Sequence, residues 1–163
     1  MDKTEKLALI ARFENAVDPL IDFVKGIPPA ALDHRPDLPQ AWTIREHAVH
    51  FLDADTFAHG RLRLAITEPG ADVFVWNEQA WQERGRYETA DALASLETSR
   101  ALRKVASAMA RALVETDWES YYVRHAVRGR LGLAQIFKVY VDHAPFHLDY
   151  FQRNLDAFKA RSA

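Results

Sequence analysis

The chain has 163 residues, 48% of them hydrophobic and 27% charged, which is ordinary for one globular domain with a sizeable core. Its net charge of −2 provides no basic surface for nucleic acid or for an anionic membrane. The chain has no cysteine, which excludes disulfides, CxxC metal sites and a protein thiol nucleophile.

The first periodic segment, residues 3 to 25, is expected to form an amphipathic helix. Ile10, Val17 and Ile21 recur at helical spacing, and Gly26 and Pro28 end the pattern. This stretch is charged and lacks the apolar run and small-residue cleavage site of a signal peptide. No later apolar run reaches the length of about 18 residues that a spanning helix needs. The expectation is therefore a cytoplasmic protein without a membrane segment.

The second segment, residues 44 to 68, has a clear start signal. Thr43 stands at the N-cap position and Glu46 follows three residues later, which is the pattern of a capping box, and Trp42 directly precedes it. Pro69 and Gly70 end the segment. A long helix with a well-defined first turn is predicted here.

Two further helices are predicted at residues 90 to 115 and 132 to 159 from their apolar periodicity. Residues 71 to 88 are expected to cross over with a short helical turn, and residues 116 to 131 include a YYV stretch that favours a brief extended run. No set of strands long enough for a sheet is evident. Together these elements predict an all-α fold, a single four-helix-bundle domain over residues 1–163 with long crossover loops.

Two histidines stand out in the last predicted helix. His143 and His147 are four residues apart, so they lie about 40° apart on a helix. They share the apolar stripe of Tyr140 and Phe151, which faces the core. Two inward imidazoles at this spacing can bind one metal ion. The structural alternative is a pair of core histidines bonded to their neighbours.

A metal site needs a third ligand from another element, and His50 of the second predicted helix is the candidate, with His47 as the fallback. His59 lies on the opposite helix face from His50 and cannot share the site. Asp53 is a candidate to orient an imidazole or a water molecule. Arg61 follows the His50 stripe and is a candidate to hold an anionic substrate.

Pro145 interrupts the last predicted helix between the two histidines. It cannot donate a hydrogen bond to the carbonyl of Val141, and inside a helix it costs about 3 kcal/mol. The apolar stripe stays in phase on both sides of the proline. We therefore expect a kink that leaves both imidazoles on one face.

The motifs resemble those of the DinB-like superfamily, which includes the bacillithiol transferases. In that group a Trp-Ser/Thr-x-x-Glu/Asp opening leads to His-x-x-Asp and a later arginine, and the last helix carries His-x-x-x-His. The matching positions of the first motif are Trp42, Thr43, Glu46, His50, Asp53 and Arg61. VDHAPFHLDYFQRNLDAF matches the second motif, although Gly132 stands where the family usually has Ser or Thr. The resemblance in the order and spacing of the motifs and helices extends over nearly the whole chain.

The resemblance implies a divalent metal ion held by three histidines and completed by water, often in a homodimer. It implies more loosely a transferase that joins a low-molecular-weight thiol to a small-molecule electrophile. Zinc or nickel is the expected metal, with iron or manganese as alternatives. A metal-dependent hydrolase and a non-catalytic, stress-related metal-binding bundle are the alternative functions. The absence of cysteine is consistent with a thiol supplied from outside.

Overall fold

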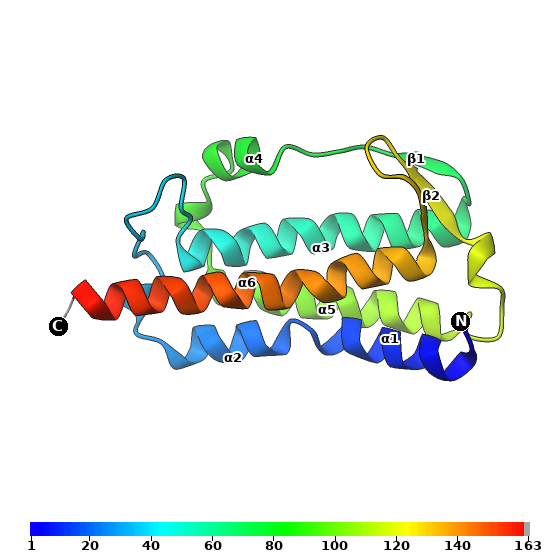
Figure 1. Cartoon of the computed structure of the whole chain (residues 1–163), viewed down its shortest axis with the longest axis horizontal. Coiled ribbons are helices and arrows are strands. Elements are labelled where there is room, and N and C mark those ends of the chain that lie inside the picture. Colours follow the sequence, from blue (N-terminus) through cyan, green and yellow to red (C-terminus); the bar gives the residue numbers. More distant parts are fainter. Residues whose placement is uncertain (162–163) are drawn as a thin grey trace.

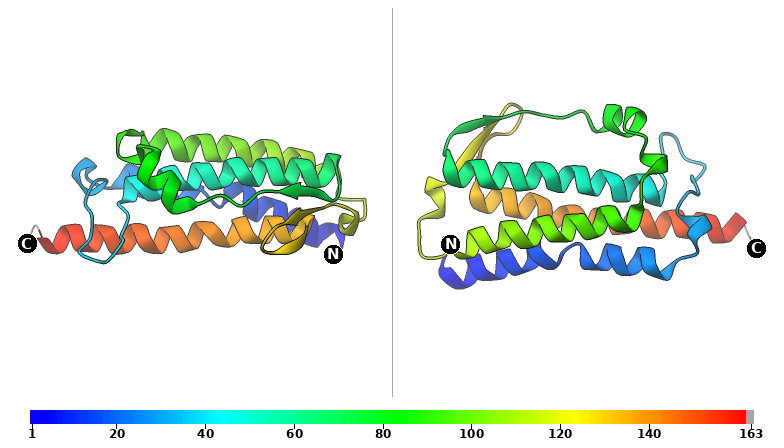
Figure 2. Two further views of the ribbon diagram at one scale, coloured as in Figure 1. Left: turned by 90° about the horizontal axis from the view of Figure 1, so that it is seen from above. Right: turned by 180° about the vertical axis from the view of Figure 1, so that it is seen from behind.

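The computed structural model describes residues 1–161 and contains a four-helix bundle (Figure 1). One side of the bundle is built by two helices placed end to end, α1 (Lys3–Asn15) and α2 (Asp18–Gly26), as Figure 2 also shows. The other three sides are α3 (Ile44–Thr67), α5 (Ala92–Arg111) and α6 (Leu133–Arg161). The predicted bundle is therefore confirmed.

Helices α3 and α5 run in the same direction, so the chain between them must return along the length of α3 (Figure 1). This crossover contains strand β1 (Ala71–Val73), the short helix α4 (Glu78–Arg84) and a 3-10 turn, η2 (Tyr87–Thr89). Two further 3-10 turns, η1 (Pro29–Ala31) and η3 (Trp118–Ser120), lie in the other connections. The crossover thus covers one face of α3 instead of leaving it to solvent.

The prediction of one continuous helix over residues 3 to 25 is wrong. Helix α1 ends at Asn15 and α2 begins at Asp18, with Pro19 in the first turn of α2. Pro19 has no N–H to donate to the carbonyl of Asn15, so a continuous helix would lose a hydrogen bond there. A proline is well tolerated in the first turn of a new helix, where no such bond is required.

The expectation that no strands form a sheet is also wrong. Strand β2 (Tyr122–His125) pairs parallel with β1 and antiparallel with β3 (Gly129–Gly132), which makes a small three-stranded sheet. The Gly70 N–H donates to the carbonyl of Tyr122 at 2.8 Å, and Gly70 has a φ of +87°, a conformation suited to glycine. The sheet fixes the crossover to the segment that precedes α6.

The second predicted helix begins as expected. The Thr43 side chain accepts from the Glu46 N–H at 3.1 Å, and the Glu46 carboxylate accepts from the Thr43 N–H at 2.7 Å. This capping box fixes the first turn of α3, and His47 and His50 come shortly after it in the same helix. Helix α6 runs without a break across Pro145, so it does not restart there; the kink remains a prediction.

A buried ion pair connects the helices at the centre of the bundle. Arg103 of α5 and Asp55 of α3 are each about 1% exposed and form two hydrogen bonds of 2.6 and 2.8 Å. Arg103 also donates to the carbonyls of Phe13 in α1 and Tyr140 in α6. One guanidinium on α5 therefore bonds to the other three sides of the bundle. In the described part of the chain, no helix is long and apolar enough to cross a membrane.

Candidate metal centre

Helices α3 and α6 bring three imidazoles together. His50 comes from α3, and His143 and His147 come from successive turns of α6. One ring nitrogen of each lies within 4.8 Å of the others, in a grouping that could hold a metal ion. The structure thus brings together the three residues that the sequence selects.

Two of the three distances between the ring nitrogens match those of ligands around one ion. The Nε2 atom of His143 lies 3.4 Å from Nε2 of His50 and 2.9 Å from Nε2 of His147. An ion about 2.0–2.1 Å from each nitrogen separates them by about 2.8–3.4 Å, for angles between a right angle and the tetrahedral value. The spacing therefore fits a shared metal ion.

Hydrogen bonding among the rings accounts for only one of the two contacts made by Nε2 of His143. A neutral imidazole nitrogen offers either one lone pair or one proton, so Nε2 of His143 cannot bond well to two neighbours at once. Burial lowers the pKa of His50 to about 4, and burial with the neighbouring His50 lowers the pKa of His143 to about 3. The pKa of His147 is lowered further, by burial and then by His143. All three rings are neutral near pH 7, the form that binds metals.

His47, the fallback ligand, lies behind the cluster and is not part of the three-histidine grouping. Its Nδ1 lies 3.2 Å from Nδ1 of His147, and its ring stacks on Tyr150 with centroids 4.8 Å apart. Burial lowers its pKa to about 3, so it is neutral and can accept from His147. A hydrogen bond on the far nitrogen of a ligand imidazole fixes the ring's orientation. His47 is therefore placed to orient His147.

The two candidate catalytic residues are placed differently. Asp53 accepts a hydrogen bond from the Tyr87 hydroxyl and lines a separate hollow with Trp81 and Arg84. No described hydrogen bond joins Asp53 to the histidines. Burial raises the pKa of Asp53, and burial with this hydrogen bond raises that of Tyr87. The predicted part of Asp53 in orienting an imidazole or water stays a prediction.

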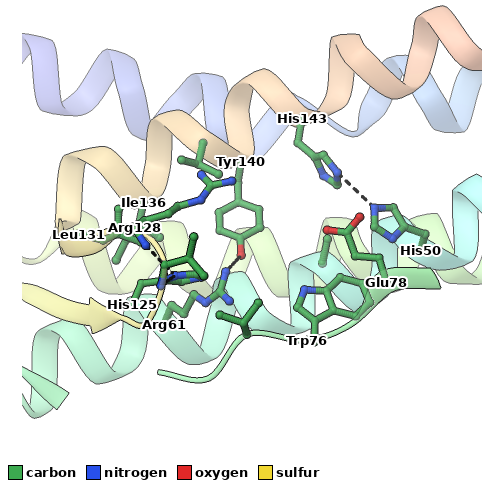
Figure 3. Close-up of a pocket in the computed structure, with 14 residues that line it drawn as sticks. His50, Arg61, Trp76, Glu78, His125, Arg128, Leu131, Ile136, Tyr140 and His143 are labelled. Carbon is green, nitrogen blue, oxygen red and sulfur yellow. Dashed lines mark hydrogen bonds between the residues drawn. The ribbon is translucent and has the colours of Figure 1, made fainter. Parts of the chain in front are cut away.

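Arg61 does line the cavity that contains His50 and His143. Its guanidinium donates to the Tyr140 hydroxyl at 2.8 Å and to the Phe74 carbonyl at 3.2 Å. Figure 3 shows Arg61 and the Tyr140 hydroxyl in the middle of the cavity, between the imidazoles of His50 and His143 on one side and His125 and Arg128 on the other. His59 lies outside the histidine grouping, as expected from the opposite helix face.

Several residues of the cavity come from the connections and were not selected from the sequence. The Trp76 ring stacks on His50 with centroids 5.4 Å apart, and Glu78 lines the cavity beside it. The Glu78 carboxylate points toward His50 and His143 (Figure 3). His125 and Arg128, from the β2–β3 hairpin, line the far end. The cavity has a volume of about 290 Å³, which suits a small molecule.

The three clustered histidines also border a second hollow on the surface. A separate hollow lined by Trp42, Phe146 and Tyr150 includes all three histidines of the cluster and His47. Glu78 lines both this hollow and the first cavity. A molecule bound at the cluster therefore has space on two sides, with Glu78 between them.

Comparison with known proteins identifies a family. Residues 12–151 match the DinB superfamily. A putative metal-dependent hydrolase of Oceanobacillus iheyensis is 31% identical over 107 residues, which cover 66% of this chain and 61% of that protein. The putative metal-dependent hydrolase YfiT of Bacillus subtilis is 25% identical over 107 residues, which cover 66% of this chain and 60% of YfiT. The matched region thus spans about three fifths of each relative.

The fold has a solved counterpart. The structure of YfiT from Bacillus subtilis, described as a probable metal-dependent hydrolase with an unusual four-helix bundle topology, matches with a TM-score of 0.84. The match covers 94% of this chain and 87% of that one at 24% identity. This likeness establishes a shared bundle.

Proposed function

The chain belongs to the DinB superfamily, and on this premise we propose that it is a metal-dependent hydrolase of a small ester or amide. His50, His143 and His147 hold the metal ion in this proposal. The observation that carries it is the convergence of three neutral ring nitrogens at spacings that suit one ion. Three histidine ligands leave positions open for water and substrate, as in catalytic sites.

A divalent ion bound there would make water more acidic and polarise a carbonyl oxygen. Zinc and nickel are the expected ions, since both accept imidazole readily; iron and manganese are alternatives. Neighbouring residues hold the histidine ligands in position. His47 orients His147 through their paired Nδ1 atoms, and Trp76 packs on the ring of His50.

Glu78 is the candidate general base. Its carboxylate faces the imidazoles from the crossover, where it can take a proton from water and return it to the departing group (Figure 3). The reaction breaks the acyl C–O or C–N bond. Water supplies the hydroxyl of the acid and the proton of the released alcohol or amine.

Thiol transfer is the second candidate. The cysteine-free sequence is compatible with it, because no protein thiol competes for the ion. The names of two relatives, both called putative metal-dependent hydrolases, support hydrolysis over thiol transfer. A non-catalytic metal-binding bundle would have the same histidines but would show no turnover.

The experiment is metal analysis and hydrolysis assays on untagged protein purified without added metal. We expect about one metal ion per chain, and loss of metal when His50, His143 or His147 is replaced by Ala. His59→Ala, on the same helix as His50 but outside the cluster, is the matched control and should keep its metal. Unchanged metal content in His50→Ala and in His143→Ala would remove the basis of the proposal.

Activity is then tested on a panel of small esters and amides, with and without chelator. We expect chelator-sensitive hydrolysis that Glu78→Gln lowers while the bound metal remains. Consumption of an electrophile only when a low-molecular-weight thiol is added would favour the transferase instead. Metal binding without either reaction would favour the non-catalytic bundle.

A further inference from the structure

The part of the cavity beyond His50 and His143 contains a cation without a counter-ion. Arg61 uses two of its five N–H donors, and both acceptors, the Tyr140 hydroxyl and the Phe74 carbonyl, are neutral. Its guanidinium lies 5.6 Å from the Phe57 ring centroid, no described carboxylate forms an ion pair with it, and its Nε is buried without a hydrogen-bond partner. An anion would stabilise this partly enclosed guanidinium, because it would accept hydrogen bonds from the N–H groups of Arg61 that have no partner.

Two neighbours of Arg61 also have a proton to donate. The Tyr140 oxygen accepts from Arg61, so its own O–H is free for another acceptor. Nδ1 of His125 accepts from the backbone N–H groups of Val127 and Arg128, each at 3.2 Å. Since Nδ1 is an acceptor, the neutral His125 ring has its proton on Nε2. Burial, Arg61 and Arg128 lower the pKa of His125, which favours that neutral form.

Without the metal ion, the charged side chains that line the cavity favour a ligand with one negative charge. Arg61 and Arg128 contribute two positive charges and Glu78 one negative charge, which leaves +1. Apolar side chains also line the cavity, namely Val75, Trp76, Leu131, Ile136 and Val139. The cavity thus combines cationic side chains, apolar walls and the imidazoles.

We infer that Arg61, Tyr140 and His125 bind a carboxylate of the substrate, which is a small monocarboxylate with an apolar body and an ester or amide bond placed at the histidines. This inference rests on the proposed hydrolase for the identity of the reacting bond. The ring centroids of Tyr140 and His143 are 6.5 Å apart, so one small molecule can reach both ends (Figure 3). Arg61 then determines which esters or amides bind productively.

The test measures binding without metal or turnover, so it succeeds or fails independently of the hydrolase. Chelator-treated protein is titrated by NMR with phenylacetate and with phenylacetamide, which has nearly the same shape and no charge. We expect phenylacetate to bind at least tenfold more tightly and to shift the Arg61 Nε–H signal. Equal binding of the two probes would overturn the inference.

Arg61→Gln should remove the preference for phenylacetate. Arg63→Gln is the matched control: it removes the same charge two residues along α3, where the exposed Arg63 side chain contacts Met109 and does not line the cavity. If Arg61→Gln does not fold, Tyr140→Phe, which removes only the hydroxyl, should weaken phenylacetate binding at least threefold. An unchanged preference in the folded variant would contradict the inference. Tighter binding of phenyl phosphate by tenfold or more would also overturn it, in favour of a dianion.

Discussion

Mild acid should destabilise the metal-free protein through its four clustered histidines, His47, His50, His143 and His147. Their pKa values in the folded protein lie well below the ordinary value of 6.5 because they are buried beside one another. In the unfolded chain they return to about 6.5. Between about pH 6.5 and about pH 4 the unfolded chain therefore binds more protons than the folded one, and stability falls as the pH falls.

The magnitude follows from the pKa difference. For His50, with a folded pKa of about 4, lowering the pH from about 7.5 to about 5.5 removes about 1.3 kcal/mol of unfolding free energy. The other three histidines have equal or lower folded pKa values, so each contributes a similar amount. The sum is about 5 kcal/mol, a large part of the 5–15 kcal/mol typical of a domain.

The assay is urea unfolding followed by far-UV circular dichroism at the two pH values, with chelator present throughout. Between the higher and the lower pH, the unfolding free energy of the wild-type protein should fall by about 5 kcal/mol. The fall for His50→Gln should be smaller by about 1.3 kcal/mol. An unfolding free energy that does not change between the two pH values would show that the folded rings take up protons over this range as readily as the unfolded ones do. The neutral cluster, and with it the argument for metal ligands, would then be refuted.

Two further predictions concern the core and the assembly. Asp55→Asn should lower the unfolding free energy by about 3–5 kcal/mol, because it leaves the Arg103 charge buried without its partner, and a midpoint in urea equal to that of the wild type would contradict this. The chain should form a homodimer through the exposed aromatic residues of the crossover, such as Phe74, which is 69% exposed. Sedimentation should give twice the 18.6 kDa of one chain and Phe74→Glu should give the monomer, whereas a wild-type monomer at micromolar concentration would refute the dimer.

The parts of the fold that the sequence predicts are those governed by local rules. Thr43 and Glu46 are three residues apart, and the capping box they form depends on little beyond the first turn. His143 and His147 lie on one helix face because of the helical period, and His50 lies on the inward face of its own helix. Such relations depend on spacing within one element, so a single sequence is sufficient to see them.

Most of the parts that were missed depend on contacts between distant segments. Strands β1 and β2 are three and four residues long, and the pairing of Ala71 with Val123 joins positions about fifty residues apart, with no hairpin signal between them. Glu78 and His125 reach the cavity only because the crossover and the hairpin pack on the bundle. The break before Asp18 had a local signal in Pro19, which the apolar periodicity on both sides obscured.

The division of the cavity between helices and connections has a consequence for how such a protein can diversify. The imidazoles of His50 and His143 and the guanidinium of Arg61 are held by α3 and α6, whereas Trp76, Glu78, His125 and Arg128 are supplied by the crossover and the hairpin. Connections tolerate substitution and changes in length far better than packed helices do. The part of the cavity lining that surrounds Arg61 and the imidazoles can therefore change in two short stretches while the scaffold stays intact. Exchanging residues 74–78 and 125–131 between relatives is the corresponding route for protein engineering.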